Sequence, residues 1–184
     1  MKVVNYCDKY REQVQKVCLL TGPPDAPNNK RVGDYILNNY CKYYIEREPE
    51  NCFTLVDDED NAVGYIICAE DFKKYKQAYK PYFEIVKNNA GKDMIEVVAE
   101  QAVLRFFSRK YPAHLHIDIL DEFTGKGSGS ALMKTLLSHL KSKGVKGVML
   151  IVGSGNTSAV RFYKRNGFRV LVSAFGGTVM GLQL

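Results

Sequence analysis

The chain has 184 residues, 46% of them hydrophobic, and a formal net charge of +6. This length and apolar content predict one domain with an adequate core, and no apolar run reaches the roughly 20 residues that a membrane-spanning helix needs. The basic residues are spread along the chain and mixed with acids, as in residues 42–50, so no basic helix or aromatic-basic stripe indicates a nucleic-acid partner.

The first third of the chain is predicted to hold a strand and two helices. Lys2–Tyr6 has the pattern of a short strand, and Asp8 can cap the helix that follows it. Helical spacing of apolar residues continues to the break at Gly22, and a second helix is expected over Val32–Tyr44.

The cysteines indicate a reducing compartment. All five lie in the first 68 residues, their number is odd, and none forms a Cys-x-x-Cys pair. This pattern favours neither a disulfide framework nor a zinc site. With no membrane-spanning run and no signal peptide at the start, we expect a cytoplasmic protein with no membrane partner.

A hairpin and a helical stretch occupy the middle of the chain. Phe53–Asp57 and Ala62–Ala69 are predicted to pair around an acidic turn, and Glu70 and Asp71 follow as either a helix start or a substrate contact. Residues 71–110 show apolar and aromatic residues at helical spacing, with an interruption near Pro81.

The stretch from Ala113 to Gly129 predicts a strand, a glycine-rich turn and a helix. Ala113–Leu120 alternates polar and apolar residues, and three glycines then fall at Gly125, Gly127 and Gly129 before an apolar helical face. Unpaired amides at such a turn, together with the helix dipole, suit a phosphate group. The spacing fits neither a dinucleotide fingerprint nor a P-loop.

A second motif begins after the apolar strand Val148–Val152. It reads Asn-Thr-Ser-Ala-Val-Arg-Phe-Tyr-Lys-Arg-Asn-Gly-Phe over residues 156–168, with a helix expected over Thr157–Arg165. A hairpin of Phe168–Ser173 and Thr178–Leu184 is predicted to close the fold around Gly176 and Gly177.

These two motifs resemble the GNAT superfamily of N-acetyltransferases. Residues 124–129 are similar to its Gln/Arg-x-x-Gly-x-Gly/Ala loop, with Thr124 in place of the long polar side chain, and residues 156–168 are similar to its Asn-x-x-Ala-x-x-Phe-Tyr-x-x-x-Gly-Phe signature. Residues 112–168 also resemble the acetyltransferase-like domains of O-GlcNAc hydrolases and their stand-alone bacterial relatives. The resemblance implies an α/β (α+β) fold whose mixed, partly parallel central sheet is split at the cofactor site and flanked by helices.

The resemblance implies one domain over residues 1–184, with 71–110 as an enlarged helical insertion that forms a lid, a specificity wall or a dimer surface. It further implies that the helices before the hairpin cover the acceptor, so Tyr35, Tyr40 and Tyr43 either line that site or only pack. The implied cofactor is acetyl-CoA, held by the backbone of the central strand, the turn amides, and side chains of the second motif. The residues concerned are Ile117, Ile119, Leu120, Gly125, Lys126, Gly127, Ser128, Gly129, Ser130, Asn156 and Phe162.

The implied chemistry is direct attack of an amine on the thioester. Tyr163 matches the superfamily's general acid, which protonates the leaving thiolate, although it could be a core tyrosine. His114, His116 and Asp118 share one face of the central strand. The two histidines resemble the proton relay of serotonin N-acetyltransferase, with Asp118 orienting them or balancing the charge. They could instead only form hydrogen bonds in the strand, and Glu70 is then the next candidate base.

A metal is not expected. The His-x-His-x-Asp order is similar to that of zinc hydrolases of the metallo-β-lactamase class, but Ile119 stands where that motif needs a further histidine. The sequence therefore predicts an acetyl-CoA-dependent N-acetyltransferase that acts on a primary amine of a small molecule or peptide, with a homodimer among the expected assemblies. The alternative is a non-catalytic coenzyme A-binding module, which would need neither Tyr163 nor the histidine pair.

Overall fold

A computed structural model describes residues 1–153, 155–174 and 176–184. Within these residues seven strands form one sheet in the order β1-β2-β3-β4-β5-β7-β6. The strands are β1 (Lys2–Asn5), β2 (Cys52–Val56), β3 (Ala62–Ala69), β4 (Ala113–Ile119), β5 (Gly147–Gly153), β6 (Arg169–Ala174) and β7 (Gly177–Gln183). The helices are α1 (Arg11–Thr21), α2 (Lys30–Tyr40), α3 (Lys42–Arg47), α4 (Phe72–Ala78), α5 (Lys80–Asn89), α6 (Met94–Phe107), α7 (Ser128–Ser142) and α8 (Thr157–Arg165).

The sheet is mixed, as predicted. Strands β1 to β4 pair antiparallel in chain order, β4 pairs with β5 in parallel, and β7 lies antiparallel between β5 and β6. The β6–β7 hairpin forms where it was predicted, and its turn includes residue 175, which lies outside the described residues.

The sheet is also split between its two parallel strands. β4 and β5 pair only through Ala113 with Val148 and His114 with Met149, although β4 continues to Ile119 and β5 to Gly153. The two strands therefore separate after their first residues, and beyond His114 no strand of the described residues lies beside β4 on the β5 side. This confirms the split that the family resemblance implies.

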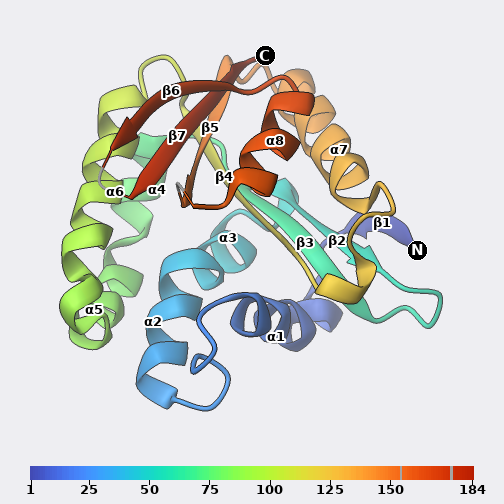
Figure 1. The fold of residues 1–184 in the computed structure, drawn as a ribbon, viewed down its shortest axis with the longest axis horizontal. Helices are drawn as coiled ribbons and strands as arrows, with labels where there is room; N and C mark the ends of the chain where they lie inside the picture. Colours follow the sequence, from blue (N-terminus) through green and yellow to red (C-terminus); the bar gives the residue numbers. More distant parts are fainter. Residues whose placement is uncertain (154, 175) are drawn as a thin grey trace.

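Two layers of helices cover the two faces of the sheet (Figure 1). One layer holds α7 and α8, whose apolar residues pack with Leu115, Leu150 and other residues of β2 to β5. The other layer holds α1, α2 and α3 together with the stack of α4, α5 and α6, and it buries an unusually aromatic cluster against the opposite face. Alternate residues of β4 thus face different surroundings.

The N-terminal helices differ from the prediction in two details. The single helix expected over Val32–Tyr44 was wrong, because Cys41 (φ −138°, ψ −63°) breaks it into α2 and α3. The expected cap by Asp8 was also wrong, since Asp8 begins a short 3₁₀ turn and its carboxylate binds Arg11 at 2.9 Å. The cap of α2 is Asn29, whose side chain accepts from the backbone of Arg31 and Val32.

The stretch from 71 to 110 forms three helices. Asp71 caps α4 by accepting from the amides of Lys73 and Lys74, which makes it a helix start. Pro81 lies in the first turn of α5, where its missing N–H is tolerated, and this separates α4 from α5. In the described part of the chain, no helix is long and apolar enough to cross a membrane.

Candidate active site

A cleft of about 1080 Å³ follows the open edge of β4. Its walls come from the end of β4 and the turn after it, the first turn of α7, the inner face of α8 and the end of α1. Nine of the sequence-predicted cofactor residues line it: Ile117, Ile119, Leu120, Gly125, Gly127, Gly129, Ser130, Asn156 and Phe162. Tyr163 and Asp118 line it as well, whereas the exposed Lys126 and the buried Ser128 do not.

The glycine turn at one end of the cleft owes its shape to left-handed backbone. Gly125 (φ +75°) and Gly127 (φ +81°) adopt conformations that L side chains rarely take, although an added Cβ would meet nothing within 4 Å at either position. Gly127 is the N-cap of α7, and no described side chain caps this helix. Its first-turn amides are therefore available to an anion, and the helix dipole favours one there.

Gly129 has a different reason to be glycine. A Cβ at this position would lie 3.2 Å from the ring of Phe162, so α7 and α8 approach each other closely here. This contact places Phe162 in the wall of the cleft. Asn156 caps α8 by accepting from the Ala159 amide at 3.0 Å, so its side-chain oxygen is engaged within the protein.

The backbone of β4 presents only alternate residues to the open edge. The Leu120 amide donates to the Val63 carbonyl at 3.0 Å, so it belongs to the ladder with β3 and is not free for a ligand. Because successive residues of a strand direct their N–H and C=O groups to opposite edges, Ile117 and Ile119 direct theirs toward the split. Two of the three predicted backbone positions are thus available.

Tyr163 lies at the inner end of the cleft, with 8% of the residue exposed. Burial, together with the negative charge of Asp118, raises the pKa of its phenol above the usual value. The hydroxyl therefore keeps its proton throughout the neutral range. A protonated phenol in the cleft wall can donate to an anion that forms beside it.

Asp118 forms no hydrogen bond with either histidine among the described residues. It accepts a hydrogen bond from Tyr65 at 2.5 Å, and burial raises its pKa, although this bond works in the opposite direction. His116 instead contacts the Tyr44 hydroxyl through Nε2 at 3.0 Å. His114 is 3% exposed, and neither ring nitrogen has a hydrogen-bond partner among the described residues.

The two histidines line a second, smaller cavity of about 70 Å³, which we call the tyrosine cavity. Polar side chains from four helices and β4 surround it: Asn39, Tyr40, Tyr44, Tyr75, Glu100, Gln101, His114 and His116. Of the tyrosines expected near the acceptor, Tyr40 lines this cavity, while Tyr35 and Tyr43 are buried in the aromatic cluster. The structure thus separates the predicted base residues: Asp118 lies with Tyr163, and the histidines lie with Glu100.

Charges in the tyrosine cavity are unfavourable. Burial lowers the pKa of His114 to about 3 and that of His116 to about 4, so both rings are neutral at pH 7. Burial, with a smaller effect of the Glu96 carboxylate, raises the pKa of Glu100 to about 7. Sequence reasoning missed Glu100, although it falls between Val97 and Leu104 on the buried stripe of α6, an unusual place for a carboxylate.

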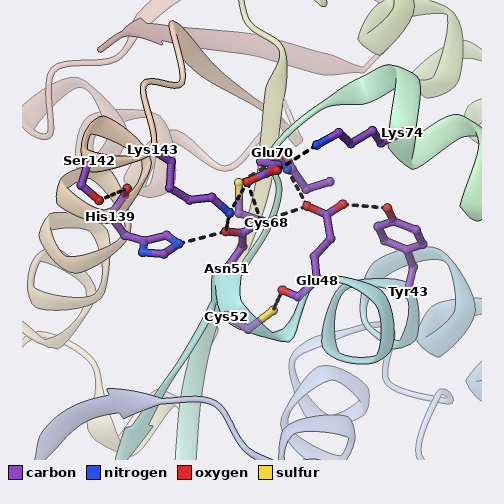
Figure 2. A network of polar contacts seen from close by, with 11 residues as sticks. Tyr43, Glu48, Asn51, Cys52, Cys68, Glu70, Lys74, His139, Ser142 and Lys143 are labelled. Atoms are coloured by element: carbon purple, nitrogen blue, oxygen red, sulfur yellow. Dashed lines mark hydrogen bonds and ion pairs between the residues drawn. The ribbon is translucent and has the colours of Figure 1, made fainter.

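Glu70 belongs to a structural network at the other end of β3 (Figure 2). Its carboxylate is paired with Lys143 and, at 3.2 Å, with Lys74. Although burial works in the opposite direction, these ion pairs hold the pKa of Glu70 below its usual value. Glu70 is therefore a poor base, and it lines neither the cleft nor the tyrosine cavity.

The remaining histidine joins the same network. His139 of α7 contacts the Asn51 side-chain oxygen at 2.9 Å, and Lys143 donates to that oxygen at 3.0 Å (Figure 2). This half-buried contact ties α7 to the sheet. Among the described residues, no group of three or more His, Cys, Asp or Glu side chains is arranged to hold a metal.

Comparisons with known proteins agree with the fold. The model of the acetyltransferase (GNAT) family matches residues 19–168. Protein O-GlcNAcase of Rattus norvegicus is 26% identical over 183 residues, a match that covers 88% of this chain and 19% of that protein. The chain thus spans about a fifth of the length of this relative, and the Mus musculus protein of the same name matches equally well.

Solved structures extend the likeness over the whole chain. The crystal structure of SsHAT is 29% identical with a TM-score of 0.83, covering 99% of this chain and 97% of that one. The PaiA N-acetyltransferase of Thermoplasma acidophilum, solved in complex with coenzyme A, shares the fold with a TM-score of 0.63 at 15% identity, covering 100% and 98% of the two chains. The chain belongs to the acetyltransferase (GNAT) family.

Proposed function

We propose that this protein is an acetyl-CoA-dependent N-acetyltransferase that moves an acetyl group directly to a primary amine of a small molecule or peptide. The observation that carries the proposal is the composition of the cleft. One continuous cleft joins the uncapped first turn of α7, the open backbone edge of β4 and the buried Tyr163 phenol. These are the features needed to hold a pyrophosphate, an extended amide-bearing arm and a leaving thiolate, respectively.

In this proposal the cofactor lies along the cleft. The amides of the first turn of α7, within residues 127–130, bind the pyrophosphate. The backbone groups of Ile117 and Ile119 hydrogen-bond the pantetheine arm as an added strand would. Phe162 packs beside the arm, Asn156 supports it by fixing the start of α8, and the exposed Lys126 adds favourable charge near the phosphates.

The reaction conserves protons within the site. The lone pair of the neutral amine forms a bond to the thioester carbonyl carbon, the C–S bond breaks, and the thiolate takes the Tyr163 proton. The new amide nitrogen then returns its surplus proton to the phenolate through solvent. The transfer itself therefore neither takes up nor releases a proton. Only the ammonium form of the acceptor must lose a proton, and it does so before the attack.

We assign that first deprotonation to the tyrosine cavity. His114 and His116 are retained in the proton path as neutral imidazoles, with the Tyr44 hydroxyl as the next group along. Asp118 is assigned to the cleft, where its hydrogen bond to Tyr65 fixes it near Tyr163. A metal has no part in this proposal.

The alternative, a coenzyme A-binding module without catalysis, has one observation in its favour. Thr124, which replaces the long polar side chain of the family loop, donates its hydroxyl to the Asp121 carbonyl at 2.8 Å and offers little to a phosphate. Turnover distinguishes the two functions. We expect acetyl-CoA to bind in calorimetry and free thiol to appear with a panel of amines; binding without thiol release would favour the module.

The setting of the enzyme is also part of the proposal. We place it in the cytoplasm because all five cysteines are free thiols, four of them buried. We propose a homodimer that covers the exposed apolar side chains of Ile95, Val98 and Phe106 on α6. Sedimentation of the wild type and of a Phe106→Ser variant tests this, since a monomeric wild type would contradict it.

A further inference from the structure

We propose that the tyrosine cavity binds the ammonium group of the acceptor, with Glu100 as its counter-charge, and that the acceptors are therefore slender primary alkylamines. This inference rests on the proposed acetyl transfer and adds its substrate class. It starts from a carboxylate in the 71–110 region that the cofactor cleft does not use. Glu100 of α6 lines the cavity, half-buried, beside Asn39 and Tyr40 of α2.

Glu100 is half-buried and lacks the partners that a structural carboxylate has. It receives only long hydrogen bonds, from Asn39 at 3.4 Å and from Tyr40 at 3.3 and 3.4 Å, and it forms no ion pair with any described residue. The buried Glu48 of the network in Figure 2 is the contrast. It accepts bonds of 2.6, 2.9 and 2.8 Å from Tyr43, Asn51 and the Glu70 amide. A carboxylate that is partly withdrawn from water without an ion pair is costly, and a bound cation would reduce that cost.

The rest of the cavity also suits an ammonium group. Tyr40, Tyr44 and Tyr75 surround it with aromatic rings, which attract cations through their faces or hydroxyl oxygens. His114 brings a neutral ring whose two nitrogens have no hydrogen-bond partner among the described residues. One of them accepts a hydrogen bond in either tautomer. The lining thus offers a carboxylate and a neutral acceptor to a three-donor cation.

The position of the cavity fits an acceptor site. His116 of β4 and Leu150 and Ile151 of β5 line it, and these residues lie just beyond the last β4–β5 pair, His114 with Met149. The cavity therefore begins where the sheet opens, on the face opposite α7 and α8. An amine held there approaches the split from the side away from the cofactor.

Glu100 can also take the proton that the ammonium must lose. The ammonium N–H proton moves to the carboxylate, which leaves a neutral amine with a free lone pair and a neutral carboxylic acid. The raised pKa of Glu100, about 7, supports this exchange. The titratable groups that face it are Tyr40 of α2, Tyr44 of α3, Tyr75 of α4, Glu96 of α6, and His114 and His116 of β4.

The size of the cavity limits the acceptor. A volume of about 70 Å³ holds a few water molecules, or the end of an unbranched chain that carries its ammonium group. Branched, aromatic or anionic head groups do not fit both this volume and the carboxylate. The side chain of lysine, a diamine and a simple alkylamine share the required group.

The test is calorimetric titration of butylammonium into the full-length protein without acetyl-CoA. We expect saturable binding to the wild type, no binding of butanol, and an affinity about 10- to 100-fold lower in Glu100→Gln. Glu96→Gln is the matched control, because it removes the same charge one turn away from an exposed position. It should change the affinity less than 2-fold, about 0.4 kcal/mol.

Three results would overturn the assignment: no binding of butylammonium to the wild type, equal binding of butanol, or equal affinity in Glu100→Gln. Thermal melts of each variant confirm that it is folded, and removal of a half-buried carboxylate is not expected to unfold it. A titration with acetyl-CoA on the same samples tests the proposed function separately. Loss of acetyl-CoA binding with retained butylammonium binding would end the transferase proposal and leave the amine site in place.

Discussion

Replacement of Gly127 by alanine tests the phosphate cradle with little steric disturbance. A Cβ at Gly127 meets no atom within 4 Å, so the change acts only through the backbone, whose φ of +81° disfavours an L residue. The left-handed conformation costs about 1–2 kcal/mol for a residue other than glycine. For a chain of this length that corresponds to a fall in Tm of roughly 2–8 °C if the turn keeps its shape.

If the turn instead relaxes in the free protein, acetyl-CoA must restore it on binding. The same 1–2 kcal/mol then appears as an affinity about 5- to 30-fold lower. Calorimetric titration with acetyl-CoA measures the affinity, and a thermal melt measures the stability. The same 1–2 kcal/mol is divided between stability and affinity, so a large loss in Tm predicts a small loss in acetyl-CoA affinity, and the reverse.

Gly144→Ala is the matched control for this experiment. Gly144 also has a left-handed φ, +72°, and an open Cβ position, but it follows the other end of α7 and does not line the cleft. We expect Gly144→Ala to lower Tm and to leave acetyl-CoA affinity unchanged. A Gly127→Ala variant that loses neither Tm nor acetyl-CoA affinity would refute the cradle, because the turn would then have relaxed without any effect on binding.

Three further predictions concern the proton path and the fold. Tyr163→Phe should keep acetyl-CoA binding but lower kcat, on the order of 10- to 1000-fold, and unchanged turnover in a steady-state assay would remove the phenol from the mechanism. Because the pKa of Glu100 is raised to about 7, its ionisation destabilises the fold fully above about pH 7 and hardly at all near pH 4.5. The free energy of unfolding of Glu100→Gln, measured by urea denaturation, should therefore exceed that of the wild type by about 3 kcal/mol at pH 8 and match it at pH 4.5. A difference that does not change with pH would contradict this. Lys143→Met should lower Tm by about 2–4 °C without changing turnover, because it removes one of the two lysines paired with Glu70 in the network of Figure 2. An unchanged Tm would show that this ion pair does not stabilise the fold.

The lowered pKa values of His114 and His116 change the pH dependence of kcat/KM that is expected. Ordinary histidines would give an acidic limb near their usual pKa in a profile of kcat/KM against pH. The lowered pKa values of about 4 and 3 for His116 and His114 keep both rings neutral well below pH 6. A limb near pH 7 that disappears in Glu100→Gln would thus belong to Glu100, and a limb that persists there would not.

The lining of the cleft along β4 could be predicted from the sequence because it depends on local backbone geometry. Left-handed turns need glycine at 125 and 127, and the close approach of Phe162 needs glycine at 129. The second motif forms α8 and its N-cap, so the spacing of its residues predicts where Asn156 and Tyr163 lie along one helix. The alternation of β4 likewise predicted which residues share a face.

The tyrosine cavity could not be predicted in the same way. Its walls come from α2, α3, α4, α6, β4 and β5, and Tyr40 lies 60 residues from the carboxylate it contacts. The partner of Asp118 is Tyr65, 53 residues away, so nothing in the His-x-His-x-Asp pattern indicated that Asp118 would bind Tyr65 and not a histidine. The break at Cys41 could not be predicted either, because the helical periodicity continues across it.

The most direct test of the central claim is product analysis after incubation of the protein with acetyl-CoA and butylamine. Mass spectrometry should find N-butylacetamide in an amount equal to the free coenzyme A thiol released, at a rate that falls in Tyr163→Phe. Butanol in place of butylamine should give no ester. Acetyl-CoA that binds in the cleft while no amine of a broad panel becomes acetylated would contradict the account, and would identify the protein as a coenzyme A-binding module.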